Sequence, residues 1–473
     1  MAKYVGSPIK RREDPRFIQG RGSYVANLKM PNMAYLAIKR SPYAHARIKA
    51  IDTEAAKALP GVIDVFTGAD TSDLGMLPSG WNVPGIKVPA NRCLQTDKVR
   101  HVGDRVAMVV AETPYIAEDA LDLIEVEYEP LPVVTGARAA TEAGAPLVHD
   151  EIANNISYTW ALGNKEATDK AFAEADKVVE LELVNQRLVA TAMEPRAAVA
   201  VWDAFKEEMT LWTTSQNPNL TRVVLSAFIL GIPEHKLRLI APDVGGGFGS
   251  KIPTYPEEAL VPWAARRIGR PVKWVATRSE SAISDTQGRD HVTICKLALK
   301  SDGTITGLQA STWANNGAYI SLVASLIPTA FYVTLLSGLY KIPAIYGEVW
   351  GTLSNTVWVD AYRGAGRPEA AYVVERLVDL AARELNMDPV EIRRKNFIPA
   401  GEFPYQTPVA LSYDSGNYQK VMDVAMESCN YGAMRSAQAE AREQGRLVGI
   451  GIGACIEASG PVPSKVAGAL GGV

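Results

Sequence analysis

A glycine-rich turn between two arginines is the segment of this chain best suited to chemistry. It reads Ala-Tyr-Arg-Gly-Ala-Gly-Arg and spans residues 361–367. A guanidinium group offers several N–H donors in a fixed arrangement that fits oxyanions, and glycines let backbone amides come close to a ligand. The segment therefore predicts contact with an anionic or oxo-bearing group. Taken alone, a tight turn beside a surface arginine explains the same residues equally well.

A second glycine-rich loop, Gly-Gly-Gly-Phe-Gly, spans residues 245–249. It is not a P-loop, because Ser250 stands where glycine must precede the lysine, and Ile252 stands where a magnesium-binding Ser or Thr is required. Ser250 also takes the third glycine position of the dinucleotide-binding pattern. What remains is a backbone that can donate several N–H groups to a ligand, with Phe248 as an apolar wall.

Single polar residues elsewhere have both a functional and an ordinary explanation. Gln216 follows a strand-like run and precedes Asn-Pro. Its amide could hydrogen-bond an oxo or hydroxo ligand, but a lone glutamine is commonly a solvated loop residue. Arg289 could equally be a surface ion pair with Asp290. His291 has no evident carboxylate partner and is expected to be structural, as is Glu194.

Composition and length describe an ordinary globular protein with room for two to four domains. The 473 residues are 47% hydrophobic and 21% charged, with a net charge of -3, which gives no nucleic-acid footprint. No run of 18 apolar residues occurs, and the N-terminus is polar, so we expect a cytoplasmic protein without a membrane span. Neither a GxSxG nor an HExxH motif is present, which leaves serine-hydrolase and zinc-peptidase functions without support.

The four cysteines are Cys93, Cys295, Cys429 and Cys455, and none forms a CxxC pair. This spacing argues against an iron–sulfur cluster, a zinc knuckle or a disulfide framework in the chain. We expect each cysteine to be a small buried hydrophobic residue. Any redox chemistry would then have to pass electrons to another subunit.

The apolar pattern predicts an α+β protein. Residues 32–128 alternate short strands with helices and suggest a compact domain of about 100 residues. A larger region follows, in which strands mix with helices over 220–230 and 257–268. Thr113 followed by Pro114 predicts the N-cap of a helix. An apolar stripe at helical spacing over residues 370–381 predicts a helix that begins at Pro368, and a capping signal predicts another from Asp388. The strands are expected at 34–38, 62–66, 105–111, 124–129, 178–182, 197–202, 209–214, 237–241 and 272–276.

The last residues of the chain have the pattern of a strand that lacks a following partner strand. Residues 449–456 look like the start of a buried strand, yet only a short Ser-Gly-Pro segment and a tail of small residues follow. A strand needs neighbours to pair with. We therefore expect the polypeptide to be truncated, or to be completed by another chain.

The motifs, taken in order, resemble those of a known family. Gln216, the 245–249 loop, Arg289 and the 361–367 loop follow one another as in the large subunit of the xanthine oxidase family of molybdenum hydroxylases, and especially in large chains of the aerobic carbon monoxide dehydrogenase and aldehyde oxidase type. Residues 13–24 are similar to the opening of that subfamily. The resemblance implies an α/β hammerhead domain within residues 1–134, a linker over 135–164, and a molybdopterin-binding α+β domain over 165–473 that lacks its C-terminal part.

The resemblance also implies roles for individual residues. In the family, molybdenum is held by a pterin rather than by protein side chains, so no direct side-chain ligand is expected. Gln216 would hydrogen-bond the apical oxo ligand, and Arg363 would stabilise negative charge near the substrate. The remaining positions divide into two sets. Cofactor contacts would come from Gly246, Gly247, Phe248, Gly249, Gly364 and Ala365, and the substrate pocket would be lined by Arg289, Tyr362 and Arg367.

Two departures from the family pattern limit the expected activity. Carbon monoxide oxidation in the family uses a cysteine directly after the arginine of the 361–367 loop to hold copper, and Gly364 occupies that place here. We therefore expect hydroxylation of an aldehyde or an aromatic N-heterocycle, with oxygen derived from water. The chain also ends before the region that supplies the family's general base. The alternative is a truncated, non-catalytic module that holds cofactor or assists assembly.

Partners follow from the same resemblance. A chain without cluster-binding cysteines needs an iron–sulfur small subunit and a medium subunit that binds FAD. The pterin is expected to be the molybdenum cytosine dinucleotide. A second copy of the heteromer and a separate C-terminal half are further expected partners.

Overall fold

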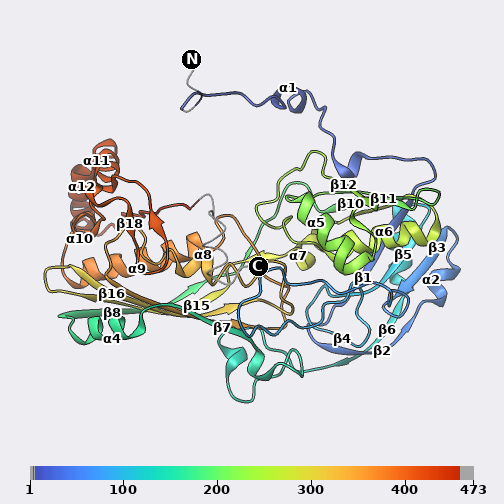
Figure 1. Cartoon of the computed structure of the whole chain (residues 1–473), viewed down its shortest axis with the longest axis horizontal. Coiled ribbons are helices and arrows are strands. Elements are labelled where there is room, and N and C mark those ends of the chain that lie inside the picture. The colour runs from blue at the N-terminus through green and yellow to red at the C-terminus, as the bar shows by residue number, and fades with distance from the viewer. Residues whose placement is uncertain (1–3, 5, 459–473) are drawn as a thin grey trace. The chain divides into compact units, whose positions relative to one another are not determined.

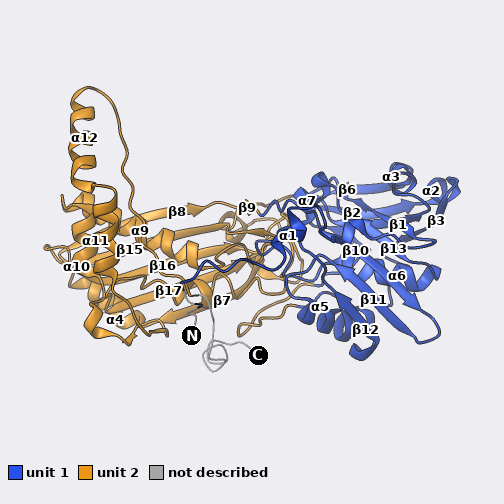
Figure 2. Cartoon of the chain, turned by 90° about the horizontal axis from the view of Figure 1, so that it is seen from above, with its two compact units in different colours: residues 1–78, 90–131, 190–285 blue, residues 79–89, 132–189, 286–473 orange. Residues whose placement is uncertain are grey.

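The computed structural model describes residue 4 and residues 6–458, and the chain forms two compact units (Figures 1 and 2). Unit 1 comprises residues 1–78, 90–131 and 190–285, and unit 2 comprises residues 79–89, 132–189 and 286–473. Each unit is therefore assembled from segments that lie far apart in the sequence. The predicted boundaries at 134 and 164 stay a prediction, although residues 156–163 of the expected linker form a strand.

Unit 1 is built on a seven-stranded mixed sheet. Its strand order is β12-β11-β10-β13-β1-β5-β3, and β1 pairs with β13 in parallel at Ala34 and Val272. The strands β1, β3 and β5 of the region predicted as a compact domain thus share one sheet with strands from residues 197–275. The strand β5 is buried at every residue, as its unbroken apolar sequence requires. The bounds are β1 Ala34–Arg40, β3 Val62–Thr67, β5 Arg105–Ala111, β10 Ala197–Asp203, β11 Glu208–Thr213, β12 Leu237–Ile240 and β13 Val272–Val275.

The remainder of unit 1 surrounds this sheet. A second sheet has the order β4-β2-β6. The predicted cap of α3 is confirmed, since the Thr113 hydroxyl accepts a hydrogen bond from the Ile116 N–H at 3.2 Å. The helix predicted over 220–230 begins at Pro218 and changes to a π-helical turn at Leu225–Leu230. The bounds are β2 Ala46–Asp52, β4 Lys98–Val99, β6 Glu125–Pro130, α1 Asp14–Phe17, α2 Glu54–Ala58, α3 Pro114–Asp122, α5 Pro218–Val224, α6 Pro256–Ile268 and α7 Arg278–Ser284.

Unit 2 is built on a five-stranded sheet of order β7-β17-β16-β15-β8. Figure 1 shows α8 and α9 on one face of this sheet and α4 on the other. The predicted apolar stripe of α9 is confirmed, because Val373, Val374 and Leu377 are buried in the core against β8 and β15. The bounds are β7 Ile156–Gly163, β8 Lys177–Asn185, β15 His291–Leu299, β16 Ile305–Asn315, β17 Ala344–Thr352, α4 Lys165–Ala173, α8 Ala330–Val333, α9 Arg367–Glu384, α10 Pro389–Asn396, α11 Tyr418–Ser428 and α12 Tyr431–Glu443.

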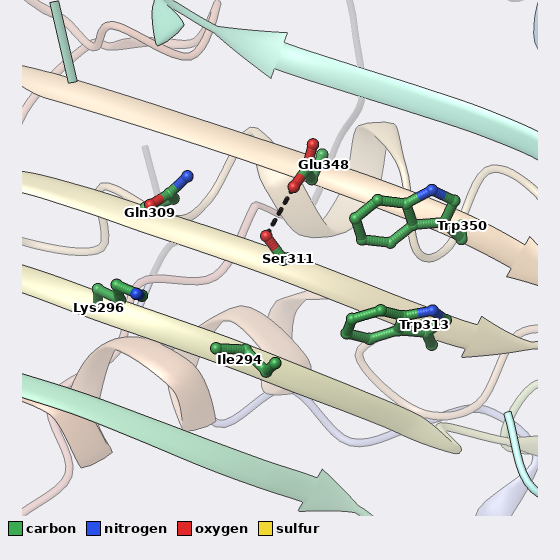
Figure 3. A pocket seen from close by; sticks show the side chains of 7 residues that line it. All are labelled: Ile294, Lys296, Gln309, Ser311, Trp313, Glu348 and Trp350. Atoms are coloured by element: carbon green, nitrogen blue, oxygen red, sulfur yellow. Dashed lines mark hydrogen bonds between the residues drawn. The ribbon is translucent and has the colours of Figure 1, made fainter. Parts of the chain in front are cut away.

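Part of the unit 2 sheet carries side chains that α4 does not cover. A hollow of about 340 Å³ lies on this face. Figure 3 shows the side chains that line it, among them Trp313 of β16 and Trp350 of β17. These two rings stack with their centroids 4.8 Å apart. Ser311 donates a hydrogen bond to Glu348 at 2.7 Å on the same face. The alternation of such half-buried residues with fully buried ones is what an amphipathic sheet requires.

Two sequence expectations are wrong in the described residues. Residues 449–456 form no strand; they run along α9 and α10, where the Ala454 N–H donates to Glu375 at 2.8 Å and Arg393 donates to the Ile452 carbonyl at 3.1 Å. The tail that follows residue 458 lies outside the described residues. Cys93 and Cys295 are buried as expected, but Cys429 and Cys455 are exposed. None of the helices in the described segments has the length and hydropathy needed to cross a bilayer.

Candidate functional site

Gln216 follows β11 and is fixed by the glycine-rich loop of unit 1. Its Oε1 accepts hydrogen bonds from the backbone N–H groups of Gly249, at 3.0 Å, and Lys251, at 3.2 Å. Its own N–H donates to the Lys251 carbonyl at 2.8 Å. The side-chain nitrogen makes no hydrogen bond with any described residue of unit 1, and the residue is exposed. The amide is thus held by its oxygen and presents its N–H donors to solvent.

The 245–249 loop needs its glycines for two physical reasons. Gly246 and Gly249 have φ values of 97° and 109°, which side chains disfavour. A Cβ on Gly247 would lie 2.3 Å from Gln216 Oε1, so only glycine lets the amide come this close. Phe248 also has a positive φ, 56°, and remains 44% exposed, as an apolar wall beside the loop would be.

Glu194 and Lys251 hold this loop in place. The sequence analysis expected Glu194 to be structural but did not identify what it binds. The Glu194 carboxylate accepts a hydrogen bond from the Gly245 N–H at 2.7 Å and forms an ion pair with Lys251 Nζ at 2.9 Å. The Lys251 side chain is 1% exposed, and burial lowers its pKa although Glu194 acts in the opposite direction. In the sequence, the carboxylate within Met-Glu-Pro-Arg was the feature that could have pointed to this contact. The expectation that Glu194 is structural agrees with this geometry.

The 361–367 loop of unit 2 is a tight turn that ends at the first residue of α9. The Ala365 N–H donates to the Tyr362 carbonyl at 2.7 Å, and Gly364, Ala365 and Gly366 have φ values of 94°, 43° and 87°. Arg363 is exposed, and its guanidinium makes no hydrogen bond or ion pair with any described residue of its unit. The loop therefore presents one unpaired cation on a backbone that is otherwise fixed.

Arg367 lies against the protein rather than in solvent. Its guanidinium is 4.3 Å from the centroid of the Phe331 ring and donates to the carbonyls of Ala365, at 3.1 Å, and Ala458, at 2.7 Å. Burial lowers its pKa, with Glu457 acting in the opposite direction. These contacts brace the turn at its C-terminal end.

Arg289 also contacts the 361–367 loop, from inside unit 2. It is 7% exposed, and it donates to the Tyr362 carbonyl at 3.1 Å, to the Arg363 carbonyl at 2.8 Å and to Glu369 at 3.2 Å. The alternative weighed from the sequence, a surface ion pair with Asp290, does not form among the described residues; Asp290 pairs with Arg187 at 2.8 Å.

His291 is buried on β15 against the ring of Tyr332. Burial, together with the charge of Arg289, lowers its pKa to about 3. The ring is therefore neutral at ordinary pH, which agrees with the expected structural role and leaves little basicity for catalysis.

The predicted residues thus lie in two groups, one within unit 1 and one within unit 2. In unit 1, Gln216 lies with residues 246–249, and in unit 2, Arg289 and Arg367 lie with residues 362–365. The described residues hold no cluster of three or more His, Cys, Asp or Glu side chains arranged to bind a metal ion. What they offer instead are amide and guanidinium donors, which suit oxo groups and phosphates rather than a bare cation.

A molybdopterin cofactor fits this donor set. The unit 1 group combines a fixed glutamine amide with a backbone kept bare by glycines, which would let an oxo-bearing group come close. In the unit 2 group, the guanidinium of Arg363 is exposed, and a guanidinium suits oxyanions. Each group, taken by itself, thus offers donors of the kind that an oxo- and phosphate-bearing cofactor would use.

Comparison with known proteins identifies both parts of the chain. A family model described as "Molybdopterin cofactor-binding domain" matches residues 148–397, and one described as "Aldehyde oxidase and xanthine dehydrogenase, a/b hammerhead domain" matches residues 19–132. The predicted hammerhead domain is thereby confirmed. The fold class is confirmed as well, because both matched domains occur in the predicted order.

Curated and solved relatives agree with the family models. The carbon monoxide dehydrogenase large chain of Afipia carboxidovorans is 38% identical over 99% of this chain and 60% of its own length. The crystal structure of quinoline 2-oxidoreductase from Pseudomonas putida 86 superimposes with a TM-score of 0.89 and 37% identity, over 94% of this chain and 56% of that chain. This chain thus spans less than two thirds of either relative.

A third relative is matched over most of its own length. The nicotinate dehydrogenase large molybdopterin subunit of Eubacterium barkeri is 32% identical over 80% of this chain and 86% of its own length. The two matched domains, the order of the four motifs and these relatives lead to one conclusion. The chain belongs to the xanthine oxidase family of molybdenum hydroxylases and carries the molybdopterin-binding domain of its large subunits.

Proposed function

We propose that this chain is the molybdopterin-binding subunit of a hydroxylase that oxidises an aldehyde or an aromatic N-heterocycle. The observation that carries the proposal is the Gln216 amide, whose oxygen is held by two backbone N–H groups beside Gly247, where a Cβ would overlap it. When bound, the cofactor supplies two-electron oxidation and the incorporation of oxygen from water. The chain's own residues bind and orient it.

Individual roles follow from the donors that each group presents. With the cofactor bound, Gln216 would donate its free amide N–H to an oxo group, and residues 246–249 would approach through their backbone. Arg363 stabilises negative charge that develops on the substrate, as a preorganised cation does. Gly364 and Ala365 contribute backbone to the cofactor side, and Tyr362 shapes the pocket.

Gly364 argues against carbon monoxide as the substrate. The residue has no thiolate to hold copper, and its φ of 94° disfavours any side chain. A Cβ at this position would lie 2.4 Å from Pro368 Cγ. We therefore propose an organic substrate with an electron-poor carbon. Carbon-monoxide-dependent dye reduction by a copper-containing preparation of the complete enzyme would overturn this assignment.

Electrons must leave through partners. We propose an iron–sulfur subunit and an FAD-binding subunit, because Cys93, Cys295, Cys429 and Cys455 occur singly in the sequence. The Eubacterium barkeri relative, of whose length this chain covers 86%, is named a subunit and supports a multi-subunit arrangement. We further propose that the pterin is the molybdenum cytosine dinucleotide, that the heteromer pairs with a second copy of itself, and that the protein is cytoplasmic.

The test is molybdenum content and turnover measured on the same preparations. The chain is produced in a host that makes the cofactor, alone and together with candidate partner subunits, and is assayed with benzaldehyde and quinoline as dye-linked substrates. We expect molybdenum in the protein and turnover only in the presence of the partners. Bound molybdenum without turnover in any combination would favour the alternative, a non-catalytic cofactor-holding module.

Matched glutamine variants make the test specific to the site. Gln216→Ala removes the amide from the 245–249 loop, whereas Gln444→Ala changes an exposed glutamine at the end of α12. We expect molybdenum content to fall several-fold in the first variant and to stay at the wild-type level in the second. Equal molybdenum content in both variants would remove Gln216 from the cofactor site.

A further inference from the structure

We infer that Arg289 is a positioning residue that holds the Arg363 loop, in place of the pocket-lining role expected from the sequence. The inference rests on the proposed function, which places Arg363 at the reacting centre. The inference is based on two observations. Arg289 is buried, and its guanidinium donates hydrogen bonds to backbone carbonyls of the loop.

The hydrogen bonds of Arg289 show where its donors are used. Nη1 donates to the Tyr362 carbonyl and to the Glu369 carboxylate, and Nη2 donates to the Arg363 carbonyl. The guanidinium also lies 4.9 Å from the centroid of the Tyr362 ring. With 7% of the residue exposed, little of the guanidinium is left for a substrate. Two consecutive carbonyls of the loop are thus bound by one rigid cation.

The backbone of Arg289 is itself strained. Arg289 and Asp290 have φ values of 64° and 67°, a left-handed conformation that non-glycine residues disfavour. Arg187 and Asn315 both donate to the Asp290 carboxylate, at 2.8 and 3.0 Å, and the Asn315 N–H donates to the Asp290 carbonyl at 3.1 Å. These bonds hold the strained pair in place and so fix the point from which the Arg289 side chain reaches the loop.

Glu369 anchors the same guanidinium to the first turn of α9. The residue is 1% exposed, and burial raises its pKa while Arg289 acts in the opposite direction. The neighbouring Gly288 allows the close packing, because a Cβ there would lie 2.2 Å from Tyr362 Cβ. Arg289 therefore joins three elements: its own strained turn, the 361–367 loop and the start of α9.

Hydrogen–deuterium exchange tests this role without relying on turnover. The loop amides of Ala365 and Arg367 are hydrogen-bonded within the turn, so exchange in residues 361–368 reports how firmly the turn is held. In Arg289→Met we expect exchange of this peptide to accelerate about tenfold, the change that corresponds to losing a charged hydrogen bond. Arg289→Lys should give a smaller acceleration, because one ammonium cannot replace the planar fork.

Arg393→Met is the matched control. Arg393 is also a buried arginine of unit 2, and it pairs with Glu375 at 2.9 Å and Asp379 at 2.8 Å, away from the loop. We expect it to lower the melting temperature without accelerating exchange in residues 361–368. Equal loop exchange in Arg289→Met and the wild type would overturn the inference, as would equal acceleration in the two arginine variants.

If Arg289→Met fails to fold, the inference is tested with a variant of Glu369, the residue that anchors the Arg289 guanidinium. Glu369→Gln keeps the shape of the side chain and removes its charge, and we expect faster exchange at 361–368; unchanged exchange there would overturn the inference. In the complete enzyme, Arg289→Lys should lower kcat more than it changes KM. The exchange result is independent of molybdenum, so failure of the proposed function, seen as protein that never binds molybdenum, is distinguishable from failure of this role.

Discussion

Gln216 and Gly249 are joined by a hydrogen bond of 3.0 Å across 33 positions of sequence, from the Gly249 N–H to the Gln216 Oε1. The bond passes beside Gly247, whose missing Cβ leaves the space that the amide occupies. The orientation of the free amide N–H groups therefore depends on a residue that has no side chain.

Gly247→Ala should displace the Gln216 amide. The added Cβ would lie 2.3 Å from Oε1 and 2.6 Å from Cδ, so the side chain must leave its two N–H partners. We expect molybdenum content to fall several-fold with a modest loss of stability, about 1–3 kcal/mol, as overpacking causes. Metal analysis and thermal unfolding of the same preparation measure both effects.

Gly401→Ala is the control for Gly247→Ala, since a Cβ at Gly401 meets no atom within 4 Å. It should leave molybdenum content unchanged. If Gly247→Ala also retains full molybdenum content, the contact between Gln216 and the loop does not govern cofactor binding.

Gly364→Cys should destabilise unit 2 rather than create a carbon monoxide dehydrogenase. The new side chain would lie 2.4 Å from Pro368 Cγ, at a φ of 94°. A left-handed non-glycine residue costs roughly 1–2 kcal/mol, and the steric overlap adds to this cost. Adding Pro368→Ala removes the clashing ring and should restore part of the melting temperature. Thermal unfolding of the single and double variants measures this, and an unchanged melting temperature in Gly364→Cys would contradict it.

Much of the fold could be predicted because local patterns were strong. The burial of β5 follows from its unbroken apolar run, and the caps of α3 and α10 follow from Thr113 and Asp388. The strands β15, β16 and β17 were missed although their buried and half-buried residues alternate. Their side chains are mixed in polarity, with Thr293 and Cys295 buried, so hydropathy alone did not mark one face.

Partners at long range could not be predicted from a single sequence. For Arg289 the sequence offered only its neighbour Asp290 as an alternative ion-pair partner, whereas the folded chain gives it Glu369, 80 positions away. Likewise, the parallel pairing of β1 with β13 joins Ala34 to Val272. Such contacts depend on how the whole chain packs. The family resemblance could nominate Gln216 and Arg363, but it gave no information on which residues hold them.

The stacked tryptophans of the unit 2 sheet should stabilise each other measurably. Trp313 and Trp350 are register partners on β16 and β17, with an interplanar angle of 21° (Figure 3). A double-mutant cycle with Trp→Leu substitutions should give a coupling of about 0.5–1.5 kcal/mol in urea unfolding. Gln309 and Tyr346 are register partners on the same two strands and serve as the control pair. A coupling no larger than that of the control pair would contradict the prediction.

The free energy of unfolding should depend on pH because of one buried carboxyl group, that of Glu258. Burial raises the pKa of Glu258 to about 7 from an ordinary value of 4.5, although Thr213 donates to its carboxylate at 2.6 Å and the Tyr255 N–H at 2.9 Å. The folded state then binds the proton more tightly than the unfolded state. The resulting stability is fully present below pH 4.5 and is lost as the pH rises to about 7, with a slope of up to about 1.4 kcal/mol per pH unit.

Glu258→Gln should remove this slope, because the amide stays neutral and can still accept a hydrogen bond from one of its donors. Urea unfolding of the wild type and the variant between pH 4.5 and 8 measures the difference. Glu443→Gln, on the exposed end of α12, is the control and should keep the wild-type slope. Parallel pH profiles for the wild type and Glu258→Gln would mean that Glu258 is ionised inside unit 1. Its charge would then need a cation closer than Arg196, whose guanidinium is bound to Glu257.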